Sequence, residues 1–150
     1  CSQSRGLGDV YKRQALGMDF VLDQNRITFK GHAMECRINA EDPVTFIPSP
    51  GKITKMHPPG GFGIRFDSHI YSGYTVPPYY DSLLAKIITA TNKRKSCIKR
   101  MKNALDEFFV EGIKTNHALH IALMNDQTFQ DNKHNINYLE NNFMKQFEND

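Results

Sequence analysis

Arg37 has the setting that best suits chemistry in this sequence. It lies within residues 31–43, where apolar and polar residues alternate, the pattern of a half-buried β-strand. Such a strand can hold one guanidinium rigidly over a cleft while its apolar face packs into a core. A guanidinium held in this way suits the stabilisation of negative charge. The simpler alternative is a solvated arginine that pairs with Glu35 or Asn39.

Asp81 is the carboxylate whose position most needs an explanation. It closely follows two prolines and precedes an apolar strand expected over residues 83–89, in which Lys86 is the single charge. A carboxylate at that point is stable where it meets a cation, so we expect Asp81 to contact and orient Arg37. The alternative is that Asp81 caps a turn through its own backbone.

Other reactive constellations are not found in the sequence. The glycine-rich residues 60–63 lead into a strand and lack the P-loop pattern, so they predict a tight turn rather than a phosphate cradle. His32, His57 and His69 have none of the spacings of metal ligands, and we expect no metal site. Residues 67–69 carry Asp, Ser and His, but neighbours on a strand face opposite sides and cannot form a triad.

The elements that must position Arg37 and Asp81 change from strands to helices along the chain. Strands are expected at 27–29, 32–40, 52–57, 64–71 and 83–89. Apolar residues then recur at helical spacing, which predicts an amphipathic helix over about 94–109 with a solvated basic face. A second helix carrying Leu119, Ala122 and Leu123 should be capped by Thr115 or Asn116, and a short one should cover 138–143. This order favours an α+β domain, a mostly antiparallel sheet followed by C-terminal helices.

The bulk composition excludes several classes of protein. With 150 residues the chain fits one domain, and its formal net charge of +3 argues against a dedicated nucleic-acid binder. No apolar run approaches the roughly 18 residues that suggest a membrane span. Cys1, Cys36 and Cys97 are odd in number and widely spaced, which favours a reduced, cytoplasmic compartment over a disulfide scaffold.

Residues 1–14 differ from the rest of the sequence. They carry no sustained period and no signal-peptide pattern, and the chain does not begin with Met. We interpret them as a non-native, artefactual segment. Residues 15–150 are then one domain cut from a longer protein.

Read in order, the motifs resemble the C-terminal domain of biotin carboxylases from about Ala15 to Phe143. The matching segments are residues 31–43, 48–53, 59–71, 73–82, 101–105, 112–116 and 138–140. The resemblance implies the fold of that domain and membership of an ATP-dependent ligase that carboxylates biotin on its carrier protein with bicarbonate.

The resemblance also implies roles for individual residues. Arg37 falls on the arginine that contacts bicarbonate and the biotin ureido oxygen, and Ile136 on the aliphatic residue that packs on the ATP adenine. Phe62 and Arg65 fall on positions of the family's homodimer contact. One departure is Asn137, where the family often has His. Asn still donates and accepts hydrogen bonds, so the adenine edge is only mildly affected.

What the resemblance leaves out is equally informative. The ATP-grasp portion, with its lysines and its glutamates for magnesium or manganese, has no counterpart in this sequence, so we expect the isolated chain to be inactive. The implied cofactors are ATP, the metal bound by the missing portion, and biotin on its carrier protein.

The end of the chain soon after residues 138–140 resembles the stand-alone subunit of bacterial acetyl-CoA carboxylase, which begins malonyl-CoA formation in fatty acid biosynthesis. The implied partners are the biotin carboxyl carrier protein, the carboxyltransferase subunits and a second copy of the chain, with no nucleic acid and no membrane. Two alternatives stay open. One is the biotin carboxylase part of a pyruvate or other acyl-CoA carboxylase, and the other is a non-catalytic dimerisation or interaction module.

Overall fold

The computed structural model describes residues 11–18 and 24–147, and its contacts divide the chain into a unit ending at Lys30 and a unit beginning at Gly31. The first unit is helical at 11–15 and has a 3₁₀ turn, η1, at Gln24–Arg26. Most of residues 1–14, interpreted above as artefactual, lie outside the described part. The expected strand at 27–29 is wrong, because these residues are irregular and pair with no strand in the described part of the chain.

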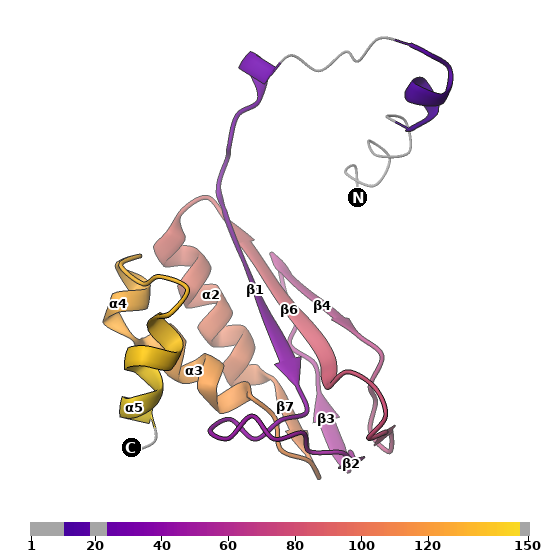
Figure 1. The fold of residues 1–150 in the computed structure, drawn as a ribbon, viewed down its shortest axis with the longest axis vertical. Coiled ribbons are helices and arrows are strands. Elements are labelled where there is room, and N and C mark those ends of the chain that lie inside the picture. Colours follow the sequence, from indigo (N-terminus) through magenta and orange to yellow (C-terminus); the bar gives the residue numbers. More distant parts are fainter. Residues whose placement is uncertain (1–10, 19–23, 148–150) are drawn as a thin grey trace. The chain divides into compact units, whose positions relative to one another are not determined.

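The second unit is built on a three-stranded antiparallel sheet (Figure 1). Its strands, in spatial order, are β1 (His32–Asn39), β6 (Leu83–Thr91) and β4 (Ile64–Ser68). Two short ribbons complete the strands, β2 (Gly51–Lys52) with β5 (Thr75–Val76) and β3 (Lys55–His57) with β7 (Phe109–Glu111). The expected strand at 52–57 is therefore split between two ribbons, since its two halves pair with different partners.

In the second unit the helices follow the strands as predicted, except that β7 comes after the first helix, and they gather on one side of the sheet (Figure 1). They are α2 (Arg94–Glu107), α3 (His117–Asn125), α4 (Gln127–Gln130), a π-helical turn η2 (Leu139–Phe143) and α5 (Met144–Phe147). The α+β class with a mostly antiparallel sheet is confirmed. No helix in the described ranges combines the length and apolar character that a membrane crossing needs.

The main core lies between the sheet and α2. Cys36 and Ile38 of β1 are 3% and 0% exposed, whereas Arg37 between them is exposed. They pack in one cluster with Met101 and Leu105 of α2, both fully buried. Each such apolar side chain contributes roughly 1.5–3 kcal/mol on burial. The alternation therefore places Arg37 on the face of the sheet that α2 does not cover.

A second core ties the ribbons to the sheet, and a third joins the terminal helices to α3. The third contains Leu119, Phe143 and Met144. On α3 the predicted apolar face is only approximate, because Leu119 is buried with Met124 while Ala122 and Leu123 are partly buried.

Gly112 allows the chain to turn from β7 towards α3. Its φ of +100° lies in the left-handed region, and a Cβ built there would stand 2.2 Å from the carbonyl oxygen of Lys52. Only glycine permits this approach without a shift of the backbone. The connection that follows, residues 112–116, is thereby held against β2 and directed to the end of β1.

Candidate functional site

Arg37 occupies the middle of β1, directly opposite Lys86 of β6. Its side chain is exposed, and no residue of ranges 11–18 and 24–147 forms a hydrogen bond or an ion pair with its guanidinium. Pairing with Glu35 or Asn39, the simpler alternative, is therefore not observed. The guanidinium is presented on a rigid strand with its hydrogen-bonding capacity unused.

The backbone around Arg37 is held by side chains of the α3 region. Asn116, 8% exposed, donates from Nδ2 to the Arg37 carbonyl at 3.1 Å and accepts at Oδ1 from the Asn39 backbone N–H at 2.9 Å. His120 Nε2 lies 2.9 Å from the same Arg37 carbonyl. β1 is an edge strand, and these contacts satisfy backbone groups that an edge would otherwise leave unpaired.

This arrangement corrects the expected capping of the second helix. Asn116 does occupy the N-cap position of α3, but its side chain makes no capping bond there. The side chain reaches across to β1 instead. Because the two segments are far apart in the sequence, only the folded chain reveals this partnership.

The His120 ring is partly buried, and burial lowers its pKa below the ordinary value. The hydrogen bond to Arg37 opposes that shift, and nearby His117 adds to it. The neutral ring must carry its proton on Nε2 to donate to the Arg37 carbonyl. At neutral pH, His120 is thus a donor that steadies the strand without adding charge beside Arg37.

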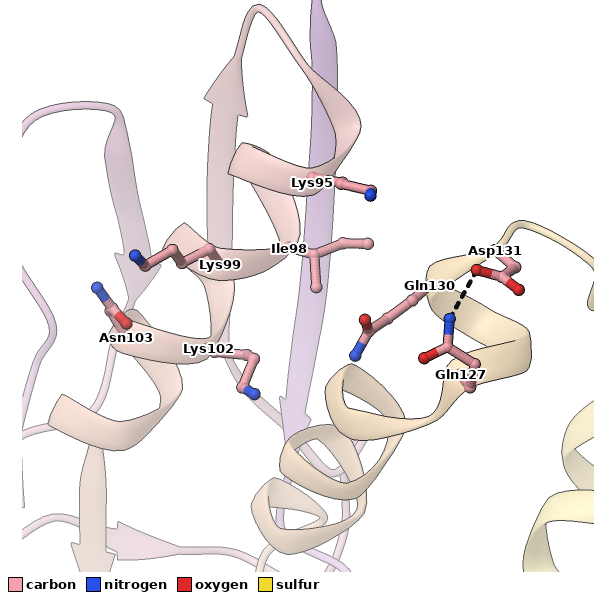
Figure 2. A pocket seen from close by; sticks show the side chains of 8 residues that line it. All are labelled: Lys95, Ile98, Lys99, Lys102, Asn103, Gln127, Gln130 and Asp131. Atoms are coloured by element: carbon pink, nitrogen blue, oxygen red, sulfur yellow. Dashed lines mark hydrogen bonds between the residues drawn. The ribbon is translucent and has the colours of Figure 1, made fainter.

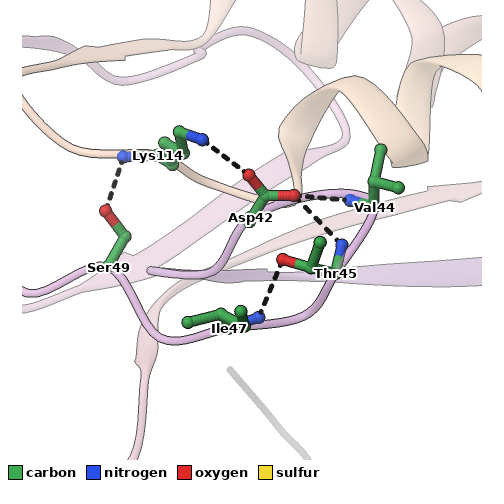
Figure 3. A network of polar contacts seen from close by, with 6 residues as sticks. All are labelled: Asp42, Val44, Thr45, Ile47, Ser49 and Lys114. Carbon is green, nitrogen blue, oxygen red and sulfur yellow. Dashed lines mark hydrogen bonds and ion pairs between the residues drawn. The ribbon is translucent and has the colours of Figure 1, made fainter.

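A polar network just beyond the same end of β1 fastens the chain to residues 112–116 (Figure 3). Asp42 accepts from the backbone N–H groups of Val44 and Thr45, both at 3.0 Å, and its other oxygen lies 2.7 Å from Lys114 Nζ. Ser49 Oγ accepts from the Lys114 N–H at 3.0 Å. These bonds hold the pKa of Asp42 well below its usual range, with the bond from Lys114 the largest cause.

A row of charges crosses the open face of the sheet. Lys86 is opposite Arg37 on one side and opposite Asp67 of β4 on the other. The pKa of Asp67 is lowered, mainly by its bond with Arg65 and to a lesser extent by the charge of Lys86. The Arg65 and Asp67 side chains pair at 2.7 Å. Two adjacent cations, Arg37 and Lys86, thus lie in a row with Asp67, whose carboxylate is already paired with Arg65.

Lys86 is the residue that the sequence reasoning did not select. The sequence does contain a feature that could have identified Lys86, because it is the single charged residue in an otherwise apolar strand. Like charges directly opposite one another on a sheet are destabilising, so the Arg37–Lys86 pair carries a cost that a bound anion would relieve.

The expected contact between Asp81 and Arg37 is not formed. Asp81 is exposed, precedes the first residue of β6, and its carboxylate makes no hydrogen bond or ion pair within the described part of the chain. The turn-capping alternative is likewise not observed. The register explains the difference, because Leu83 pairs with Asn39, which leaves Arg37 opposite Lys86 and Asp81 beyond the end of the ladder.

The remaining site residues lie on loops and on β4. Phe62 is 100% exposed in the turn before β4, close in sequence to Arg65 on that strand. Ile136 is 97% exposed in the segment between α4 and η2. No contact within the described residues joins Ile136 to Arg37. Among those residues there is also no group of three or more His, Cys, Asp or Glu side chains placed to hold a metal ion.

Comparison with known proteins gives a consistent match. Residues 35–141 fit the family model of the biotin carboxylase C-terminal domain. Biotin carboxylase from Haemophilus influenzae is 55% identical over 135 residues, which cover 88% of this chain and 30% of that protein. Biotin carboxylase 1 from Bacillus subtilis is 48% identical over 136 residues, with the same coverage of 88% and 30%. The chain therefore spans about 30% of the length of these relatives.

Solved structures match as well. Biotin carboxylase from Campylobacter jejuni, in a complex with a β,γ-ATP ligand, has a TM-score of 0.75 and 45% identity over 81% of this chain and 27% of its own. The biotin carboxylase domain dimer of Hydrogenobacter thermophilus 2-oxoglutarate carboxylase, bound to MgADP, ADP and bicarbonate, has a TM-score of 0.78 and 43% identity, covering 85% and 28%.

Proposed function

Since the chain belongs to the biotin carboxylase C-terminal domain family, we propose that it supplies one wall of the active site of an ATP-dependent ligase that carboxylates biotin with bicarbonate. The observation that carries this proposal is Arg37, an exposed and unpaired guanidinium among the described residues on a strand whose backbone is clamped by Asn116 and His120. A fixed donor of this kind suits a reaction in which negative charge develops on an oxygen atom.

Arg37 acts in this proposal on the anionic groups of the reaction. Its guanidinium donates to bicarbonate and to the ureido oxygen of biotin as that oxygen gains negative charge. Arginine keeps its charge at physiological pH, so it stabilises the oxyanion without transferring a proton to it. Donors fixed towards developing charge typically lower the barrier by about 3–4 kcal/mol.

Lys86 and Asp81 complete the charged surroundings of Arg37. Lys86 adds a second positive charge across the strand pair, and Asp67 of β4 lies opposite it on the other side. Asp81, which precedes β6 and has no partner within the described residues, adds one negative charge beyond the end of the ladder. Ile136 packs on the adenine of ATP in this proposal. Its side chain is almost fully exposed, so its apolar surface is free to contact the flat face of an adenine ring. The metal that accompanies ATP is magnesium or manganese, and it is held by the ATP-grasp portion.

The proposed assembly is a homodimer formed through Phe62 and Arg65. A fully exposed aromatic ring is the kind of side chain that protein interfaces cover, and a relative with 43% identity is described as a dimer. We place the enzyme in the cytoplasm as the biotin carboxylase of acetyl-CoA carboxylase, working with a biotin carboxyl carrier protein and carboxyltransferase subunits. A role in pyruvate carboxylase is the alternative, since a Methanothermobacter pyruvate carboxylase subunit is 44% identical over 126 residues.

The test is a chimera that joins residues 15–150 of this chain to the portion of Haemophilus influenzae biotin carboxylase that they do not cover. Wild-type chimera should carboxylate free biotin with ATP and bicarbonate. Arg37→Ala should lower kcat by about two to three orders of magnitude, the usual effect of losing an oxyanion donor. Lys86→Met should raise the KM for bicarbonate, with Lys52→Met as the matched control on an exposed strand position.

A folded, dimeric chimera without activity would favour the non-catalytic interaction module instead. The bicarbonate-dependent ATPase reaction without biotin separates two roles of Arg37. If Arg37→Ala abolishes that partial reaction as fully as biotin carboxylation, the arginine serves bicarbonate activation and not the later oxyanion.

A further inference from the structure

A groove with a volume of about 560 Å³ runs between α2 and α4, away from Arg37. Three lysines of α2, Lys95, Lys99 and Lys102, line it together with the amides of Gln127 and Gln130 (Figure 2). Its volume falls within the roughly 300–1,000 Å³ of typical small-molecule sites. The groove is on the helical side of the sheet, whereas Arg37 projects from the uncovered face.

The three lysines are an uncompensated positive cluster. None forms a hydrogen bond or ion pair with any residue of ranges 11–18 and 24–147. Their spacing puts them on one side of α2 over about 10 Å, at 1.5 Å of rise per residue. Lysines four residues apart, such as Lys95 and Lys99, repel each other on a helix. The cluster therefore costs stability unless an anion neutralises it.

Asp131, the carboxylate that lines the groove, does not balance these charges. Asp131 Oδ1 accepts from Gln127 Nε2 at 2.7 Å, and its Oδ2 pairs with Lys133 at 3.3 Å. The pKa of Asp131 is lowered chiefly by these two bonds, and Lys95 is only a minor cause. The groove thus keeps an excess of positive charge.

The walls of the groove are braced from behind. Arg94 of α2 donates from Nη2 to the Phe129 carbonyl at 2.6 Å and lies 5.3 Å from the centre of the Phe129 ring. Gln130 Nε2 donates to the Met124 carbonyl at 2.9 Å. Ile98, 5% exposed, forms an apolar floor between the lysines. These contacts hold α2 and α4 together, so the groove is formed before any ligand binds.

We propose that this groove binds a small polyanion with two or three linked phosphate groups. Lysine binds phosphate as a point charge, and three ammonium groups along about 10 Å of helix match a chain of phosphates better than a single one. The amides offer further donors, and the apolar floor accepts a non-polar part of the ligand. This site is independent of the proposed biotin carboxylation, because it uses other elements of the fold.

Titration of the 15N-labelled 150-residue chain with inorganic triphosphate, followed by NMR, tests the proposal. Saturable shifts are expected for backbone amides of residues 94–103 and 127–131, at about 20 mM salt so that screening is weak. Combined Lys95→Ala, Lys99→Ala and Lys102→Ala should weaken binding at least tenfold. Alanine favours helix, so this variant should keep its fold, and arginine at the same three positions should restore binding.

The control removes the same charge elsewhere, with Lys30→Ala, Lys52→Ala and Lys55→Ala combined, and should leave affinity unchanged. If both triple variants bind triphosphate equally weakly, the binding depends on the overall positive charge of the chain and not on the groove, and the proposal is overturned. Orthophosphate binding as tightly as triphosphate would also overturn it. Tighter binding of poly-glutamate than of triphosphate would assign the groove to an acidic protein surface instead of a small ligand.

Discussion

Replacement of Asn116 by Ala should destabilise the fold through the backbone of β1. The substitution removes two hydrogen bonds, from Nδ2 to the Arg37 carbonyl at 3.1 Å and from the Asn39 N–H to Oδ1 at 2.9 Å. The Arg37 carbonyl keeps His120 as a donor, but the Asn39 N–H loses its acceptor. An unsatisfied buried group costs about 1–3 kcal/mol and a lost hydrogen bond about 1 kcal/mol, so the expected total is about 2–4 kcal/mol.

Urea denaturation of the chain, followed by circular dichroism, measures this loss directly. A loss of that size should also lower Tm by roughly 5–15 °C, at about 2–4 °C per kcal/mol for a protein of this size. Asn103→Ala is the matched control, because Asn103 is exposed on α2 and makes no hydrogen bond within the described residues. It should be neutral or slightly stabilising. A loss below about 1 kcal/mol for Asn116→Ala would refute the view that this side chain holds β1.

Three further outcomes are expected. Burial, with a smaller effect of Glu35, raises the pKa of Cys36 to about 12, so iodoacetamide at about pH 8 should alkylate this thiol only after unfolding, as mass spectrometry would reveal. The pKa of His120 in the folded protein lies below its unfolded value near 6.5. The contribution of His120 to folding stability is therefore complete above about pH 6.5 and is lost as the pH falls through the folded pKa. The free energy of unfolding should therefore decline as the pH is lowered below about 6.5. His120→Gln should make the plot of unfolding free energy against pH less steep, by at most about 1.4 kcal/mol per pH unit. The same slope in the variant and the wild type would contradict this role of His120. In the chimera, Phe62→Ala with Arg65→Glu should shift sedimentation towards monomer, and an unchanged dimer would place the interface elsewhere.

The local pattern of residues determined the strand that carries Arg37 and the helix that packs behind it. Alternation along β1 put Cys36 and Ile38 in the core and left Arg37 exposed, because successive side chains of a strand face opposite sides. The helical spacing of apolar residues likewise located α2 to within about two residues at its C-terminal end. Both patterns are local, so the sequence alone displays them.

Elements that depend on a distant partner were placed less well. Residues 27–29 have the composition of a strand, but they pair with no strand among the residues that the structure describes. Residues 52–57 were expected as one strand, yet they divide between a ribbon with β5 and a ribbon with β7. A strand is completed by hydrogen bonds to another strand, which composition does not specify.

The neighbours of Arg37 were decided by tertiary structure alone. The register of β1 on β6 set Lys86 opposite Arg37 and left Asp81 beyond the ladder, although Asp81 had the more suggestive position in the sequence. Asn116 reached the Arg37 backbone from a segment 79 residues away. A shift of one residue in register would turn every side chain of the strand to the other face. Packing of the whole sheet fixes that register, and no single segment of the chain contains it.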